Sequence, residues 1–141
     1  MKCFFDTSVL IPVFLEDHVH HERSLAAFLR AGPGDACCAA HSLAELYATI
    51  TRLPGAHRLS GEQALLFVQE ICNRLAQISL DADEYLATIE ECSASKIVGG
   101  AVYDALLARC AMGAGTEIIY TWNVRHFERF GPEIRGRLQT P

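Results

Sequence analysis

The chain has 141 residues, 50% of them hydrophobic, and a mean hydropathy of +0.16, which fits one domain with a sizeable core and excludes an intrinsically disordered protein. No apolar run approaches the roughly 20 residues needed to span a bilayer, and no signal-peptide pattern is present, so we expect a cytoplasmic protein without membrane contact. The net charge of −5 argues against a protein that coats nucleic acid through a basic face.

The charge is unevenly distributed along the chain. Residues 1–95 carry six Lys or Arg and thirteen Asp or Glu, whereas residues 96–141 carry six and four. Four arginines of the last third are candidates for phosphate contacts, although a solvated basic tail or a surface for an acidic partner explains them equally well. They are Arg125, Arg129, Arg135 and Arg137.

Six cysteines and three neighbouring histidines raise the question of a disulfide framework or a metal site. The cysteines lie mostly in apolar segments, without a C-x-x-C pair or the spacing of a zinc site, and we expect buried, reduced thiols. The histidines His18, His20 and His21 stand in a polar stretch between two expected helices, without a pattern of acids beside them. We expect them to lie in a solvated loop.

The first half of the chain alternates short apolar runs with longer segments of helical periodicity. Gly32-Pro33-Gly34 ends one helical segment and Pro54-Gly55 ends another. The pattern predicts two short buried strands and three helices. In chain order they are a strand at Cys3–Phe5, helices at Val9–Glu16 and His20–Ala31, a strand at Ala36–Ala40 and a helix at Ser42–Arg52.

The second half continues this alternation. Because strands separated by helices are parallel neighbours joined by crossovers, the α/β pattern predicts an α/β/α sandwich with a short parallel sheet of about four or five strands, in one domain over residues 1–141. The expected elements are a helix from Gly61 to Leu75, a strand at Ile78–Leu80, helices at Asp81–Ser95 and Ala101–Met112, a strand within Glu117–Thr121, a helical turn through Phe130 and an edge strand near Ile134.

The first strand ends abruptly in an acid and two hydroxyls, Asp6-Thr7-Ser8, before the chain turns apolar again. Asp6 is therefore expected at the carboxyl edge of the sheet, where open α/β sheets bind their ligands. Residues of these types also cap helices by accepting bonds from the first free backbone N–H groups. Taken alone, Asp6 fits a helix cap at least as well as a site.

Three further polar residues fall near strand ends or early in helices: Glu45, Asp104 and Asn123. With Asp6 they form a set that can converge on one site. Each also has a structural explanation, since Ser42 and Glu45 match a capping box, Asp104 suits a helix N-terminus, and Thr121 or Asn123 can cap a turn. One shared site is more economical than four separate caps.

Metal-assisted phosphodiester hydrolysis is the chemistry that uses such a set. Mg²⁺ and Mn²⁺ prefer carboxylate and amide oxygens, and they lower the pKa of a bound water so that it can attack phosphorus. Clustered carboxylates repel one another, which raises at least one pKa until a cation binds. His126 is a candidate for proton transfer or phosphate binding, and a structural role for it is equally plausible.

The chain resembles a PIN domain, and more narrowly a VapC-type toxin ribonuclease of a bacterial toxin–antitoxin pair. Four stretches match in order and spacing over essentially the whole chain. They are Phe5-Asp6-Thr7-Ser8-Val9-Leu10, Ser42-Leu43-Ala44-Glu45-Leu46-Tyr47, Tyr103-Asp104-Ala105-Leu106-Leu107-Ala108 and Thr121-Trp122-Asn123-Val124-Arg125-His126-Phe127.

The resemblance implies a metal-dependent endoribonuclease that uses Mg²⁺ or Mn²⁺ and cuts a structured RNA such as tRNA or ribosomal RNA. It also implies a homodimer that is held inactive by a cognate VapB-like antitoxin, whose C-terminal segment lies over the active site. The resemblance assigns Asp6, Glu45 and Asp104 as acidic metal ligands and Asn123 as the fourth metal-site residue, with Thr7, Ser8 and Thr121 in support.

One position departs from the family pattern, because many PIN domains have Asp where this chain has Asn123. An amide oxygen can bind a metal but brings no charge, so we predict one firmly held ion and a weaker second one. A DNA nuclease or phosphatase on a similar sandwich, and a non-catalytic PIN-like module that binds RNA or protein, are the alternatives. The module is disfavoured because it has no reason to keep all three acids.

Overall fold

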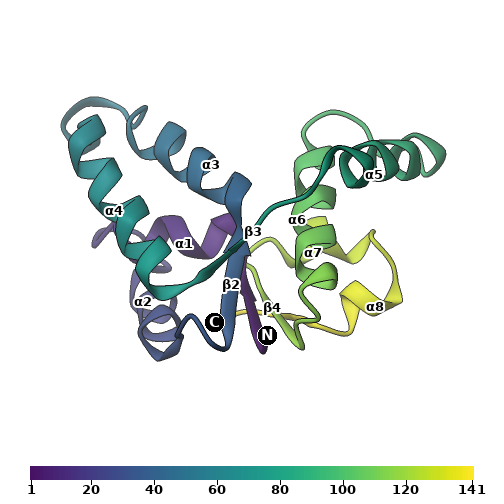
Figure 1. The fold of residues 1–141 in the computed structure, drawn as a ribbon. Helices are drawn as coiled ribbons and strands as arrows, with labels where there is room; N and C mark the ends of the chain where they lie inside the picture. Colours follow the sequence, from purple (N-terminus) through teal and green to yellow (C-terminus); the bar gives the residue numbers. More distant parts are fainter.

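The structure is a computed structural model that describes residues 1–141. Its centre is a sheet of five parallel strands in the order β3-β2-β1-β4-β5, which agrees with the predicted α/β/α sandwich (Figure 1). The strands are β1 (Cys3–Phe5), β2 (Ala36–Ala39), β3 (Ala76–Ile78), β4 (Ile118–Tyr120) and β5 (Leu138–Gln139).

Helices cover both faces of the sheet, with α1 to α4 on one side and α6 to α8 on the other, and α5 packs on the outside of α6 (Figure 1). None of them combines the length and apolar character that crossing a bilayer requires. Their bounds are α1 (Thr7–Val13), α2 (His21–Arg30), α3 (Ala40–Ile50), α4 (Gly61–Arg74), α5 (Ala82–Ala94), α6 (Ala101–Gly113), α7 (Val124–Glu128) and α8 (Pro132–Arg135), with a 3₁₀ turn at Gly55–His57.

The central strand β1 sends alternate side chains into two separate cores, because successive residues of a strand point to opposite faces. Phe5 packs in the core formed with α1 to α4, and Phe4 packs in the core formed with α6, α7 and α8. Both phenylalanines are at most 1% exposed. The residue that follows them, Asp6, is thereby fixed in the middle of the carboxyl edge of the sheet.

Two predicted strands lie elsewhere than expected. β3 occupies Ala76–Ile78 instead of Ile78–Leu80, because its partner β2 ends at Ala39, opposite Ile78, and offers no hydrogen bonds beyond that point. The edge strand near Ile134 is also wrong. Gly131, with a φ of 108°, turns the chain into the short helix α8, and the strand β5 follows it at Leu138–Gln139.

Two predicted helices begin later in the sequence than the observed ones. α1 spans Thr7–Val13 instead of Val9–Glu16 and starts directly after Asp6. α3 starts at Ala40 instead of Ser42, because Ala39 is both the last residue of β2 and the N-cap of the helix. This shift places Ser42 inside the helix.

All six cysteines are free thiols. Burial in β2 raises the pKa of Cys37 to about 11 and that of Cys38 to about 12. These two thiols are therefore uncharged at neutral pH and behave as small apolar core residues.

Candidate active site

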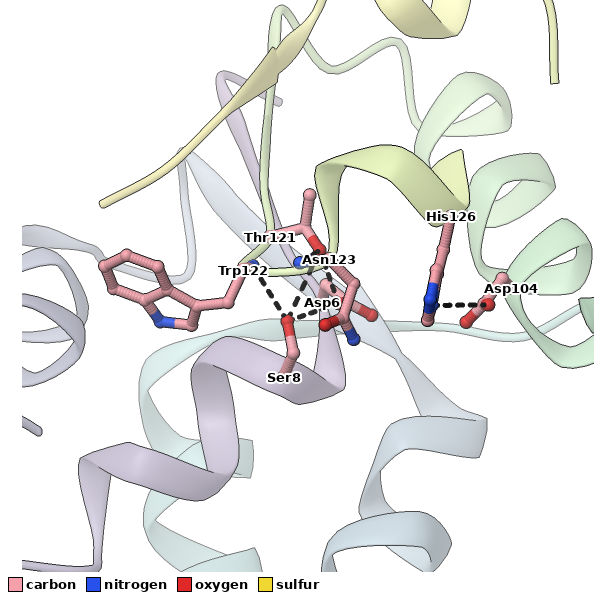
Figure 2. A network of polar contacts seen from close by, with 7 residues as sticks. All are labelled: Asp6, Ser8, Asp104, Thr121, Trp122, Asn123 and His126. Atoms are coloured by element: carbon pink, nitrogen blue, oxygen red, sulfur yellow. Dashed lines mark hydrogen bonds and ion pairs between the residues drawn. The ribbon is translucent and has the colours of Figure 1, made fainter. Parts of the chain in front are cut away.

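Asp6 is the central residue of the predicted site and is only 3% exposed. Its Oδ2 atom accepts hydrogen bonds from two hydroxyls, that of Ser8 at 2.6 Å and that of Thr121 at 2.8 Å (Figure 2). No basic side chain forms a salt bridge with it. Burial raises the pKa of Asp6, and the two hydroxyls oppose this rise by stabilising the ionised form.

Backbone N–H groups orient both hydroxyls. The N–H of Trp122 donates to Ser8 Oγ at 3.0 Å, and the N–H of Asn123 donates to Thr121 Oγ1 at 2.9 Å. A hydroxyl has one proton to donate. Because an ionised carboxylate can only accept, each hydroxyl donates its own proton to Asp6 while its oxygen accepts the backbone proton. The turn after β4 thus holds the carboxylate of β1 in one orientation.

Trp122 connects this turn to α2. Its indole Nε1 donates to Ser24 Oγ at 2.9 Å, and its ring is stacked on His20 with a centroid distance of 3.7 Å and an angle of 7°. The guanidinium of Arg23 lies 5.1 Å from the centre of the same ring. The prediction of a solvated histidine loop is therefore wrong for His20, and His21 belongs to the first turn of α2.

Glu45 approaches the site from α3. Its Oε1 lies 3.4 Å from the Thr7 hydroxyl and 3.2 Å from Nε2 of His41, one helical turn earlier. The capping box suggested by Ser42 and Glu45 does not form, because the N-cap of α3 is Ala39 and Ser42 lies inside the helix. The buried Ser42 hydroxyl accepts from Thr7 at 2.8 Å. Burial, followed by repulsion from the two other acids of the site, raises the pKa of Glu45 to about 7.

Asp104 lies in the first turn of α6, where the helix dipole also favours an acid. Its Oδ2 lies 3.8 Å from Nδ1 of His126, which projects from α7 (Figure 2). Burial and then the charge of Asp6 raise the pKa of Asp104, while the charges of His126 and Arg129 oppose the rise. The cationic side of the site is therefore α7.

The structure brings the predicted residues to one edge of the sheet. Asp6, Glu45 and Asp104 act on one another through repulsion, although no three acidic, His or Cys side chains lie close enough to hold a single ion in this arrangement. Asn123 is exposed at the N-cap position of α7, where its side chain makes no capping bond. The carboxylate and amide oxygens available here are those that a hard divalent cation prefers.

Sequence reasoning missed two contact residues of the site, His41 and Trp122, and gave Ser42 a capping role that it does not have. His41 escaped notice because α3 was expected to begin one residue after it, at Ser42. The spacing of His41 and Glu45, four residues apart in one helix, is the signal that a correct helix start reveals. Trp122 escaped notice because its contact with Ser24 joins segments far apart in sequence.

The sequence profile of the PIN domain matches residues 3–131. The chain is 31% identical to ribonuclease VapC40 of Mycobacterium tuberculosis over 125 residues, which is 89% of each protein. It is 35% identical to ribonuclease VapC27 of the same species over 106 residues, 75% of this chain and 74% of that relative. The fold, the acidic edge and these matches define an α/β nuclease class, and the chain belongs to the PIN domain family.

Solved structures agree with this assignment. Mycobacterium tuberculosis VapC20, described as a toxin that cleaves the sarcin-ricin loop, superposes with a TM-score of 0.72 at 14% identity, over 89% of this chain and 92% of that one. That likeness shows a common fold. A DNA-bound VapBC from Salmonella typhimurium gives a TM-score of 0.66 at 25% identity, over 99% of this chain and 98% of that one.

Proposed function

We propose that this chain is the endoribonuclease toxin of a type II toxin–antitoxin system, acting as one nuclease domain over residues 1–141. The observation that carries the proposal is the buried carboxylate of Asp6, which two hydroxyls hold in one orientation by hydrogen bonds. In addition to burial, its charge raises the pKa of Glu45 and of Asp104, which come from two other elements. Similarity to proteins named ribonuclease VapC40 and VapC27 supports RNA as the substrate.

A divalent cation, Mg²⁺ or Mn²⁺, fits this donor set. In addition to burial, the charges of Asp6 and Asp104 raise the pKa of Glu45, and the charge of Asp6 raises that of Asp104. A cation between the carboxylates would relieve that repulsion. Asp6, Glu45, Asp104 and Asn123 would hold the ion. When bound, the ion would supply an activated water for attack on phosphorus.

The other side chains orient the groups around the phosphate. Ser8 and Thr121 fix the direction of the Asp6 carboxylate. Thr7, which donates to Ser42 at 2.8 Å, lies 3.4 Å from Glu45 and makes at most a weak contact with it. His126, whose side chain is 57% exposed on the α7 side, can bind a phosphate oxygen or carry a proton to the leaving oxygen.

The proposed partners follow from the relatives. Structures of VapBC complexes, among them VapBC2 of Rickettsia felis and VapBC-1 of Haemophilus influenzae, align over 99% of this chain. We therefore propose a VapB-like antitoxin as the stable protein partner, a homodimer as the toxin assembly, and tRNA or ribosomal RNA as the target. The net charge of −5 suits a basic peptide partner.

The proposal is tested by incubating purified protein with total RNA in Mg²⁺, in Mn²⁺ and in EDTA. We expect discrete fragments with either metal and none in EDTA. Asp6→Asn and Asp104→Asn should abolish cleavage, whereas Asp83→Asn, an exposed acid of α5, should leave it unchanged.

Three other results would redirect the assignment. Cleavage that survives Asp6→Asn would place the site elsewhere. Tight RNA binding without cleavage would favour a non-catalytic module. Preferential hydrolysis of DNA or of a phosphomonoester, measured in parallel, would favour a DNA nuclease or phosphatase.

A further inference from the structure

An aromatic pair stands beside the acids of the site. The Tyr103 ring is stacked on His41 with a centroid distance of 5.4 Å and an angle of 16°. The two residues come from α6 and α3, which flank opposite faces of the sheet (Figure 1). The pair therefore bridges the two helices that carry Asp104 and Glu45.

The position of the pair is fixed from both sides. His41 Nε2 lies 3.2 Å from Glu45 Oε1, and Tyr103 directly precedes Asp104 in the first turn of α6. His41 and Glu45 are one helical turn apart, so their Cβ atoms lie about 5–6 Å from each other. This separation is comparable to that between the base and the phosphate of one nucleotide, so a base stacked on the pair of Tyr103 and His41 would leave its phosphate near Glu45.

Packing does not account for the exposure of Tyr103. The residue is 52% exposed, although one face of its ring is covered by His41. Burial of an aromatic side chain is favourable, so a ring that served only to join α3 to α6 would be expected to lie deeper. The exposed part of the ring is available to a further planar group.

We propose that Tyr103, supported by His41, is the stacking platform for an unpaired nucleobase next to the scissile phosphate. This inference rests on the proposed ribonuclease function and adds the residue that binds the base. Every base has a π-face, and stacking on an aromatic side chain needs no charge. Stacking can therefore hold a nucleotide at a site whose three acids repel its phosphate.

The first test compares RNA affinity in EDTA, where cleavage is prevented. With a short single-stranded oligoribonucleotide, Tyr103→Ala should weaken binding about tenfold, and Tyr103→Phe, which keeps the ring, should restore the affinity. Tyr47→Ala is the matched control, because Tyr47 is a 45% exposed tyrosine of α3 whose hydroxyl lies against Gly61 of α4. Equal affinities of wild type and Tyr103→Ala would overturn the proposal.

The second test scans an abasic site through the substrate under cleavage conditions. Wild type should show a raised KM when the abasic site lies at one position beside the cut. Tyr103→Ala should show a raised KM on intact RNA, a nearly unchanged kcat, and no further loss at that position. The same abasic profile in wild type and Tyr103→Ala would overturn the proposal and leave Tyr103 as a strut between α3 and α6.

The two tests separate this inference from the proposed function. If wild type does not cleave RNA but Tyr103→Ala still weakens binding in EDTA, Tyr103 binds a base, whereas the ribonuclease assignment and the place beside a scissile phosphate both fail. If Tyr103→Ala unfolds, Tyr103→Leu keeps the apolar bulk without the π-face, and the same loss of affinity is expected from it. Unchanged affinity in a folded Tyr103→Leu would overturn the proposal.

Discussion

At the level of individual residues, the candidate site is centred on one buried carboxylate, that of Asp6. Burying an ionised carboxylate is costly unless hydrogen bonds compensate for the lost water. Here two hydroxyls supply them, and both are held by backbone N–H groups of the turn after β4. The orientation of Asp6 is therefore set by a chain segment more than a hundred residues away.

Replacing Thr121 tests this dependence. Thr121→Val removes a donor to the buried Asp6 and should lower the free energy of unfolding by about 2 kcal/mol at pH 8. The loss should shrink towards pH 4, because protonated Asp6 no longer needs the donor. Urea denaturation measures both values. Thr88→Val, at a buried threonine that donates to the Glu84 carbonyl, should cost about 1 kcal/mol at either pH.

A pH-independent loss in Thr121→Val would contradict this account, since it would mean that the hydroxyl stabilises packing and not the ionised carboxylate. Thr121→Ser, which keeps the hydroxyl, should retain the pH dependence of the wild type.

Glu45 makes the stability of the fold depend on pH. Its pKa is raised from 4.5 to about 7, so folding disfavours its ionised form. The stability that this carboxyl contributes is present below pH 4.5 and is lost as the pH rises to about 7. Glu45→Gln should therefore have a higher Tm than wild type at pH 8, and the difference should vanish at pH 4. Thermal unfolding from pH 4 to 8 measures this.

Glu90→Gln is the matched control, because Glu90 is an exposed acid of α5 that takes part in no salt bridge. A Tm of Glu45→Gln that stays at or below the wild-type value at pH 8 would show that repulsion among the three acids does not destabilise the fold. Added Mn²⁺ should raise the Tm of wild type at pH 8 more than that of Glu45→Gln, because the ion relieves that repulsion.

The helices that carry or support the site begin in two different ways. α4 and α5 start with capping boxes, Ser60 with Gln63 and Asp81 with Glu84. In contrast, α1 and α3 start directly at the carboxyl ends of β1 and β2, without a capping box. The helices next to the site thus leave their first polar side chains free to act in it.

Ser60→Ala tests the cap of α4. The variant loses the bond that the Ser60 hydroxyl accepts from the Gln63 N–H, and the free energy of unfolding should fall by about 1 kcal/mol. Chemical denaturation measures this loss. Ser93→Ala, at an exposed serine of α5, is the control and should be nearly neutral. If RNA cleavage also falls in folded Ser60→Ala, α4 positions the site more directly than its contacts indicate.

Most elements were predictable from the sequence because their signals are local. The buried strands and the periodic helices follow from apolar spacing. The acids Asp6, Glu45 and Asp104 follow from their place in that pattern, after β1, within α3 and in the first turn of α6. The exact starts of α1 and α3 were missed. The sequence pattern led us to expect a short loop between each strand and the helix after it, but each helix begins at the strand end. The edge strands β3 and β5 depend on their partners, which no local window contains.

The contacts inside the site were less predictable than its residues. The sequence indicated Asp6 and Thr121 as members of one site, but the direction of their hydrogen bond depends on the backbone around Trp122 and Asn123. Likewise, Thr7 donates a hydrogen bond to Ser42 because α1 and α3 pack against each other there. Such pairings result from tertiary packing.

Over the whole molecule, the net charge of −5 opposes RNA binding, so affinity for RNA must come from a local surface. The cationic side of the site is α7 and the residue after it, where Arg129 acts on Asp104. Arg30, in contrast, lies near Cys3 at the amino edge of the sheet, away from the acids. The two arginines therefore allow a comparison between a positive charge beside the site and one far from it.

Arg129→Gln should weaken RNA binding in EDTA and reduce the slope of log affinity against log salt concentration by about 0.7–1, the value for one lost phosphate contact. Arg30→Gln should leave that slope unchanged, because a charge at the opposite edge is screened over about 10 Å at 0.1 M salt. Binding measured at several salt concentrations gives both slopes. Equal changes in the two variants would mean that the RNA responds to total charge, and that α7 provides no specific path for the phosphates.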